Sequence, residues 1–420
     1  MKLQVRDLAI FGGQSLFACP LAVGNPNKLD RDAFLARIAD VLDSGQLTND
    51  GPQVKAFEAR IRRVTGTRHA IAVCNGTMAL QIMAMACDLT GDVIVPAMTF
   101  IATAHALRWV GLNPVFADVH RRTHTLDADS VAACISPRTS AILGVHLWGN
   151  PCDVDRLLAV AKQHGLPLLF DASHAFGCKS HGIRIGGLGD AEAFSFHATK
   201  VLQAIEGGAI TTNNDQLADR CRRLRNFGIT GLTQINDIGT NGKMSEIAAA
   251  AGLTSFATLQ DVIEANKRNY TQYQTGTADI PGFDLIRLTA DHRGNAQYVV
   301  AHVVEQKFGM SRNDLLPILR AEGIFARSYF EPGCHKAAPY TERQIHQPVD
   351  LPVTDGVLSD VIQFPTGTSV SSDDIAAVTD VIRFAQRHSA AVDSFRKAQN
   401  LQLVPHPQDP VVFPSLPDAA

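Results

Sequence analysis

The 420-residue chain has no long hydrophobic run and no excess of positive charge. A helix that spans a bilayer needs roughly 18 or more apolar residues, and no stretch approaches that length. The N-terminus MKLQVRDLAIFGG also lacks the apolar region of a signal peptide. We therefore expect a cytoplasmic protein without a membrane segment. The net charge of −3, with lysine and arginine scattered along the chain, argues against nucleic acid as a partner.

Spacings typical of metal sites are also missing. The eight cysteines lie far apart without a C-x-x-C pair, so we interpret them as mostly reduced core residues rather than zinc ligands or a disulfide scaffold. No histidine shows the H-E-x-x-H spacing of zinc-dependent proteases or a similar pattern. The sequence therefore predicts no metal.

Hydrophobic residues make up 45% of the chain and charged residues 19%, a balance typical of a protein that folds over most of its length. Because single cores stop growing at roughly 250–300 residues, we expect two domains. The predicted parts are a large domain at 1–275, a smaller α+β C-terminal domain at 276–395 and an extended tail at 396–420.

Between residues 65 and 215, short apolar runs alternate with amphipathic stretches, a pattern typical of β-α-β units in a mainly parallel sheet. One helix is predicted to begin at Asp153 and end at Gly165. Further helices are expected at 216–228, where the chain leaves the sheet, and at 244–274, between the two domains. The predicted strands are 69–74, 92–96, 139–147, 167–173, 191–196 and 209–213.

Asp171 directly follows the apolar run LPLLF, at the expected carboxyl end of a parallel strand. Proteins of the α/β class bind their ligands at such ends. A buried carboxylate needs a cationic partner or hydrogen-bond donors to stay ionised, and the protonated ring nitrogen of a cofactor is one such partner. Position alone leaves a helix cap as an equal alternative.

Lys200, in SFHATK, lies just past another predicted strand end, so it can approach the same crevice as Asp171. A lysine in a partly desolvated site has a lowered pKa, which supplies the neutral amine needed for imine formation and proton transfer. Most lysines are solvated surface groups, and that alternative stays open at this point.

The passage AVCNGTMAL places Gly76 and Thr77 at the N-terminus of a predicted helix, where N–H groups and the helix dipole favour a phosphate. An ordinary Asn-Gly turn before a helix is the alternative. Phe100, in PAMTFIATAHA, follows the next strand, where its side chain either stacks on a flat ring or belongs to the core.

Five motifs follow one another along the chain: CNGTMAL, PAMTFIATAHA, DASHAFG, SFHATK with EGGAITTN, and GTNGKMSE. Together they resemble the DegT/StrS family of sugar aminotransferases, which use pyridoxal 5′-phosphate (PLP). The likeness extends from FGG near residue 11 to PTGT at 365–368. The resemblance implies an α/β fold, fold type I of the PLP-dependent transferases, whose large domain holds a mixed, mainly parallel sheet of seven strands.

The resemblance also implies a role for each matched residue. Lys200 corresponds to the lysine that forms the Schiff base with PLP, Asp171 to the carboxylate on the pyridine nitrogen, and His174 to the residue near the 3′-oxygen. Phe100 corresponds to the aromatic residue that stacks on the ring. Phosphate contacts correspond to Gly76, Thr77, Ser195 and, from the other subunit of a homodimer with shared active sites, Asn241.

Further matches concern the substrate and the type of reaction. His197 is expected beside the substrate, and His146 is a second candidate for that position. Asn75 stands where serine is frequent in the family, and VLQAIEGG replaces a more usual asparagine-containing stretch. A subgroup with histidine in place of the lysine performs sugar dehydration or deoxygenation, so Lys200 favours transamination.

We therefore predict a PLP-dependent aminotransferase that moves an amino group from L-glutamate to a keto group of a nucleotide-linked deoxysugar, for amino-sugar biosynthesis. The PLP residues do not separate this function from that of a fold type I enzyme acting on a non-sugar ketone or as a lyase. A PLP-binding regulator without catalysis is disfavoured by the low basic charge.

Overall fold

The computed structural model describes residues 2–287, 294–342 and 349–398. Its centre is a seven-stranded sheet in which β10 runs antiparallel to both neighbours, whereas all other neighbouring strands are parallel. The predicted mixed, mainly parallel seven-stranded sheet is confirmed. In spatial order the strands are β2 His69–Val73, β10 Gly208–Thr212, β9 Ala191–Ser195, β6 Leu168–Asp171, β5 Thr139–Val145, β3 Asp92–Pro96 and β4 Asn113–Ala117.

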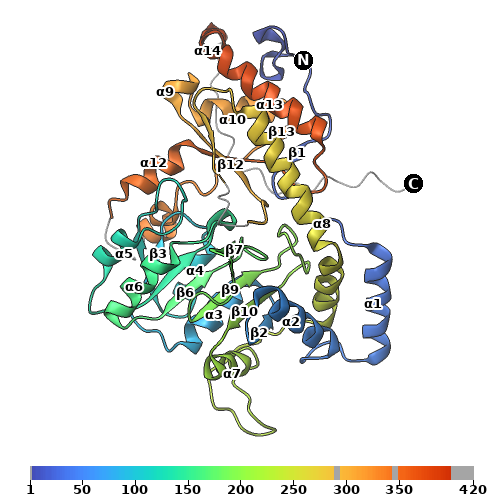
Figure 1. Cartoon of the computed structure of the whole chain (residues 1–420), viewed down its shortest axis with the longest axis vertical. Coiled ribbons are helices and arrows are strands. Elements are labelled where there is room, and N and C mark those ends of the chain that lie inside the picture. Colours follow the sequence, from blue (N-terminus) through green and yellow to red (C-terminus); the bar gives the residue numbers. More distant parts are fainter. Residues whose placement is uncertain (1, 288–293, 343–348, 399–420) are drawn as a thin grey trace.

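Helices cover both faces of this sheet and give the large part of the molecule three layers (Figure 1). One face carries α3 Gly76–Ala86, α4 Ala102–Trp109 and α7 Asp215–Leu224. The other face carries α2 Pro52–Thr65, α5 Ala128–Cys134 and α6 Val154–His164.

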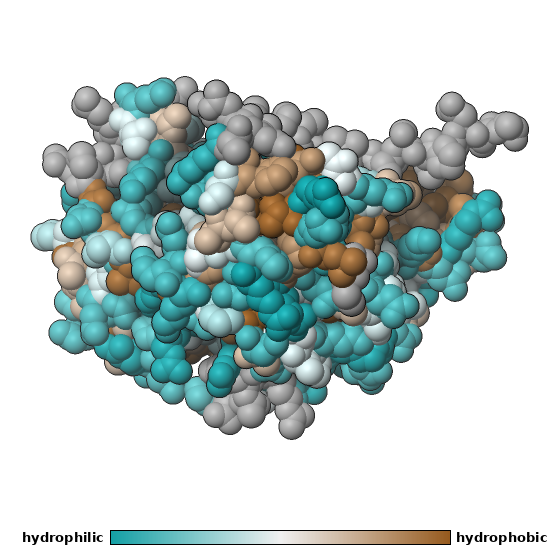
Figure 2. All heavy atoms as spheres, turned by 90° about the horizontal axis from the view of Figure 1, so that it is seen from above, coloured by the Kyte–Doolittle hydropathy of each residue, from teal (hydrophilic) through white to brown (hydrophobic). Residues whose placement is uncertain are grey.

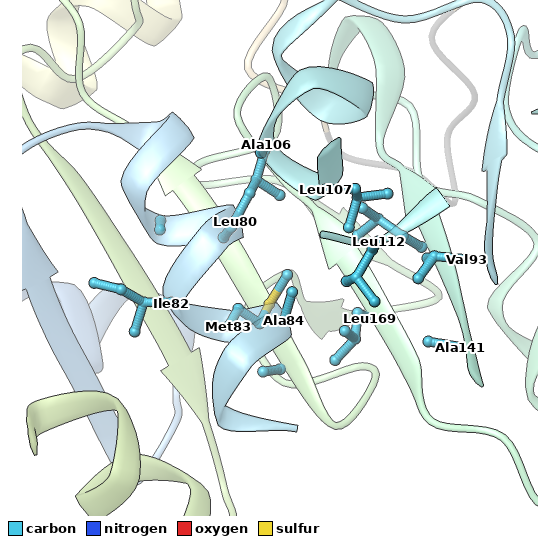
Figure 3. Packing of buried hydrophobic residues seen from close by; sticks show 14 of the residues in the cluster. Leu80, Ile82, Met83, Ala84, Val93, Ala106, Leu107, Leu112, Ala141 and Leu169 are labelled. Carbon is cyan, nitrogen blue, oxygen red and sulfur yellow. The ribbon is translucent and has the colours of Figure 1, made fainter. Parts of the chain in front are cut away.

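Helix α3 begins where its sequence provides a cap. The side chain of Asn75 accepts a hydrogen bond from the N–H of Met78 at 2.8 Å, which satisfies one of the first-turn donors. Beyond the cap the helix is apolar on nearly every side, because it lies between the sheet and other helices. Figure 3 shows Leu80 and Met83 of α3 packed between Ala106 of α4 and Leu169 of β6.

The predicted start and end of α6 are confirmed. Asp153 accepts a hydrogen bond from the N–H of Arg156, and Gly165 ends the helix with a φ of 64°. The prediction that the helix after β10 leaves the sheet is wrong. Helix α7 packs on β2, β10 and α3, because Leu217 and Leu224 on its apolar face are buried against them.

The C-terminal part is built on a second, antiparallel sheet of β11 Phe283–Leu285, β12 Val299–Val303 and β14 Val361–Phe364. The long helix α8, Glu246–Thr277, begins at the cap Ser245 and connects this part to the large sheet (Figure 1). The other helices here are α9 Glu305–Phe308, α10 Arg312–Ala321, α11 Ala338–Thr341, α12 Pro352–Asp360, α13 Ser372–Arg387 and α14 Ser389–Ala398.

The N-terminal segment, predicted with the large domain, packs instead on the C-terminal core. Leu8 and Leu21 are buried among residues of β12, α10 and α13. Strand β1, Leu21–Ala22, pairs in parallel with β13, Ile324–Phe325, before α1, Arg31–Ser44, packs on α8. We therefore propose that the smaller domain includes this segment, and the boundary near residue 275 stays a prediction.

The predicted tail at 396–420 begins inside a helix, because α14 extends to Ala398. Its remainder, residues 399–420, lies outside the described residues. Throughout the described ranges, no helix combines the length and the apolar character needed to cross a membrane. On the face seen from above in Figure 2, hydrophilic side chains surround smaller hydrophobic areas, as on most folded proteins.

Candidate active site

Several predicted residues lie together at one edge of the large sheet. Strands β2, β6 and β9 run in the same direction, so their carboxyl ends meet at this edge. Asp171 is the last residue of β6 and Ser195 the last of β9, while Gly76 begins α3 just after β2. Sheet topology therefore gathers groups that lie more than 100 residues apart in the sequence.

The Asp171 carboxylate is buried and held on both oxygens. Its Oδ2 accepts a hydrogen bond from Thr103 Oγ1 at 2.8 Å, and its Oδ1 accepts one from the N–H of Ser173 at 3.0 Å. Residues 172–178 form turns rather than a helix, so Asp171 is not a helix cap. Two donors keep the group in a fixed orientation, with its charge available to a cation.

Lys200 is half-buried rather than a solvated surface residue. Its Nζ lies 3.4 Å from the hydroxyl of Tyr298. Burial lowers the pKa of the Lys200 amine to about 8, although the negative charge of Asp171 acts in the opposite direction. An appreciable fraction of the amine is therefore neutral near neutral pH, which is the form that attacks an aldehyde.

His174 lies beside this lysine within a group of aromatic rings. Its ring centre is 4.3 Å from that of Tyr298 and 5.8 Å from that of Trp148. Burial and, to a lesser extent, the charge of Lys200 hold the pKa of His174 well below its usual range. The imidazole is thus neutral, and its Nδ1 accepts a hydrogen bond from the N–H of Trp148 at 3.4 Å.

The start of α3 provides space for a phosphate. A Cβ atom at position 76 would lie 2.8 Å from the Cβ of Ser195, so only glycine fits there without displacing its neighbour. The first N–H groups of a helix have no partners within the helix and attract anions. Ser195 adds a hydroxyl beside Gly76 and Thr77. The described residues therefore fit PLP, with separate groups for its phosphate, ring nitrogen and aldehyde.

Three other predicted residues lie nearer the surface. Phe100 is 55% exposed and its ring centre lies 6.3 Å from that of Phe330, so it is not a core residue. His197 is part-buried, with Nδ1 2.9 Å from the hydroxyl of Thr199. Asn241 is exposed in the single chain, on a segment that pairs with Asn226.

The structure does not bring His146 to the site, in contrast to the expectation of a substrate contact. Its ring is fully buried, stacks on Phe170 at 4.4 Å and has Nε2 3.5 Å from Glu192 Oε2. Burial favours the neutral ring, but Cys152 and Glu192 together raise the pKa of His146 to about 9. His146 is therefore an internal packing residue with a carboxylate partner.

The aromatic wall of Trp148, Tyr298 and Phe330 was not predicted. Trp148 lies three residues beyond the end of β5, near the carboxyl end of a parallel strand, which is the kind of position that identified Asp171. Tyr298 and Phe330 come from the C-terminal part, and their local sequence carries no sign of this approach. Within the described ranges, no cluster of three or more His, Cys, Asp or Glu side chains could hold a metal ion.

A seven-stranded mixed sheet, with a lysine, an aspartate and a helix N-terminus at one edge, defines a transferase of the PLP-dependent fold type I class. The family model of the DegT/DnrJ/EryC1/StrS aminotransferases matches residues 28–383, and the chain belongs to this family. The predicted family and the predicted enzyme class, an aminotransferase, are confirmed.

Curated relatives extend over most of the chain. A dTDP-4-amino-4,6-dideoxy-D-glucose transaminase of Shigella dysenteriae is 33% identical over 364 residues, which cover 87% of this chain and 98% of the relative. A GDP-perosamine synthase of Caulobacter vibrioides is 33% identical over 369 residues, covering 86% of this chain and 95% of the relative.

A solved structure of DesI in the presence of its TDP-sugar product is 46% identical to the chain. It has a TM-score of 0.90 and covers 94% of this chain and 100% of the solved chain. At that similarity the two chains share their fold, and together with the family match this confirms the predicted fold type I.

Proposed function

We propose that the chain uses PLP to move an amino group from L-glutamate to the keto group of a nucleotide-linked 6-deoxyhexose. The observation that carries this proposal is the Lys200 amine, because burial lowers its pKa to about 8. The amine also lies close enough to Asp171 for the negative charge of that carboxylate to affect its pKa. The relative from Shigella dysenteriae, named for a 4-amino-4,6-dideoxy sugar linked to dTDP, supports C4 as the position of the new amine.

When bound, PLP supplies an aldehyde that takes up the amino group and a ring that withdraws electron density from the substrate carbon. Asp171 would hold the proton on the ring nitrogen, because its fixed carboxylate favours a cation beside it. Lys200 Nζ, once released from the aldehyde, would carry a proton away from the substrate carbon as a general base. Tyr298 keeps its proton because burial raises its pKa, so its hydroxyl can orient Nζ.

The remaining predicted residues would position the cofactor and the substrate. The N–H groups of Gly76 and Thr77 and the hydroxyl of Ser195 would bind the phosphate. Phe100 would stack on the ring, and the neutral imidazole of His174 would lie near the 3′-oxygen. His197 is part-buried and lies between Ser195 and Lys200 in the sequence, and it remains the candidate for a substrate contact.

We also propose a homodimer in which Asn241 reaches the phosphate site of the other subunit. The segment between α7 and α8 protrudes from the molecule (Figure 1) and exposes a series of large apolar side chains. A monomer rarely exposes such a group without a partner. Its members are Phe227, Ile229, Leu232, Ile235 and Ile238. Sedimentation velocity would test whether the chain forms a dimer. The cytoplasmic location predicted from the sequence also stays part of the proposal.

The function can be tested with the full chain, PLP, ¹⁵N-labelled L-glutamate and a TDP-linked 4-keto-6-deoxyhexose. Mass spectrometry should show the heavy nitrogen in the nucleotide sugar. Lys200→Ala should abolish transfer, whereas Lys162→Ala, at an exposed lysine of α6, should leave it unchanged. Amination of a non-sugar ketone, without transfer to 3-keto or 4-keto sugars on TDP or GDP, would contradict the proposed substrate.

A further inference from the structure

A chain of hydrogen bonds connects the aromatic wall of the proposed site to the C-terminal part of the molecule. The indole N–H of Trp148 donates to His124 Nδ1 at 3.2 Å. His124 Nε2 lies 2.9 Å from His302 Nε2, and His302 Nδ1 lies 2.7 Å from Asp360 Oδ1. We call these four side chains the indole relay.

The relay crosses from the large sheet to the smaller one. His124 lies in the loop that follows β4, whereas His302 lies on β12 and Asp360 ends α12. The same loop holds α12 from a second point, because Asp118 accepts hydrogen bonds from the N–H groups of Val353 and Thr354. The relay is therefore part of a contact between two parts of the fold.

The donors and acceptors permit one order of protons through the relay. An indole only donates, so His124 Nδ1 must accept and its proton must sit on Nε2. That proton can only be given to His302 Nε2, which leaves the His302 proton on Nδ1, facing the Asp360 carboxylate. Each group thus fixes the tautomer of the next, from the acid to the indole.

The surroundings keep the middle of the relay uncharged. Burial is the largest cause that holds the pKa of His124 well below its usual range, and a positive charge on His302 or on Arg121 would act in the same direction. Arg121 also donates to Asp360 Oδ2 at 3.0 Å. His120, on the same loop, would lower the pKa of His124 further if it carried a positive charge. A second proton on either imidazole would place two N–H groups face to face in one contact of the relay, where one donor and one acceptor are needed. All three hydrogen bonds therefore require both imidazoles to be neutral.

Trp148 needs such support because of its backbone. It has a φ of 59°, in the left-handed region that a bulky residue rarely adopts, and His124 has a φ of 61°. The indole is only 2% exposed and stacks on Phe330 at 5.2 Å, while the N–H of Trp148 donates to His174. Trp148 therefore contacts the His174 imidazole through both its backbone N–H and its indole ring.

We propose that His124 and His302 are positioning residues, which act through the indole of Trp148 to hold His174 in place. This inference rests on the proposed function only in what it predicts for the rate of the reaction. Its structural claim, that His302 fixes an indole two side chains away, is tested without any turnover.

The structural claim can be tested by fluorescence of the full-length enzyme. The chain has two tryptophans, and Trp109 is 82% exposed, so a Trp109→Phe background leaves Trp148 as the single tryptophan. His302→Leu removes both ring nitrogens from the relay. Quenching of Trp148 by acrylamide should then rise at least twofold. His302→Gln, which offers an amide oxygen to His124, should restore part of the protection.

A matched control separates the relay from the contact between the two parts. Arg121→Gln removes the ion pair with Asp360 but leaves all three bonds of the relay. This variant should show the quenching of the background. Equal quenching in the Arg121 and His302 variants, or no change in His302→Leu, would overturn the proposal.

Kinetics give a second, independent measure. With the nucleotide sugar as substrate, His302→Leu should lower kcat about fivefold, equivalent to about 1 kcal/mol, and leave KM within about twofold. Trp148→Phe keeps a ring but loses the N–H, so His302→Leu should have no further effect in that background. Additive losses would refute the relay. If no amination occurs at all, the quenching experiment still decides the structural claim.

Discussion

The pKa of Lys200 gives the sharpest test of the proposed site. A lysine with its ordinary value of 10.5 is roughly 0.03% neutral at pH 7, whereas one at about 8 is roughly 10% neutral, a gain of about 300-fold. Burial is the main cause of the lowered value, and the charge of Asp171 limits it. Asp171→Asn removes a negative charge that stabilises the ammonium form. The pKa of Lys200 should therefore fall further, by about one pH unit or more.

The assay is labelling of the PLP-free enzyme with acetic anhydride between about pH 6 and pH 11, followed by peptide mass spectrometry. Only the neutral amine reacts, so the midpoint of labelling at each lysine reports its pKa. Exposed Lys162 serves as an internal reference in every sample. Asn is close in shape to Asp, and its Oδ1 can accept from the N–H of Ser173 while its Nδ2 donates to Thr103 Oγ1, so the substitution tests charge rather than packing.

Two results would refute this reasoning. If Lys200 in the unchanged enzyme titrates together with Lys162, its amine is solvated and the site is not built as described. If Asp171→Asn leaves the midpoint unchanged or raises it, the carboxylate does not act on the amine through its charge. A fall in the Lys200 midpoint with no change at Lys162 is the expected outcome.

Three further predictions concern the lysine, the phosphate space and the core. Lys200→Ala should leave no PLP attached after borohydride reduction, and label on another peptide would disprove its role. Gly76→Ala places a Cβ 2.8 Å from that of Ser195, so PLP affinity in equilibrium dialysis should fall at least tenfold; unchanged affinity would place the phosphate elsewhere. Met83→Ala should lower the free energy of unfolding in urea by about 2–5 kcal/mol, because Met83 is buried between helix and sheet; a loss under about 1 kcal/mol would contradict that packing.

The sequence predicts the groups that depend on local pattern. Asp171 could be placed at a strand end because the apolar run before it is short and bounded, and α3 could be placed because Asn-Gly-Thr caps and opens a helix. The family motifs then connected these groups to PLP. All of these features are encoded within about ten residues of chain.

Long-range packing is what the sequence did not predict. His302 lies on the otherwise apolar strand β12, and the residues around it in the sequence do not indicate that its partner, His124, lies 178 residues away. Leu8 is likewise part of the C-terminal core, in a segment that is held there by the pairing of β1 with β13 and by hydrogen bonds from the N–H groups of Ala9 and Leu16 to Glu322. Such contacts depend on how whole elements pack, and periodicity within one element carries no record of it.

The position of His146, expected beside the substrate, could have been predicted correctly from the alternation of side chains along its strand. Side chains alternate between the two faces of a strand, so Leu169 and Asp171 point to the face of α3, whereas Phe170 points to the opposite face. On β5 the same alternation places odd-numbered residues on the α3 face and His146 with Phe170, where the structure has it. Ser195, odd-numbered on β9 like buried Ala193, lies on the α3 face and reaches Gly76. The face of a strand, in addition to its end, therefore decides which polar residue can belong to the site.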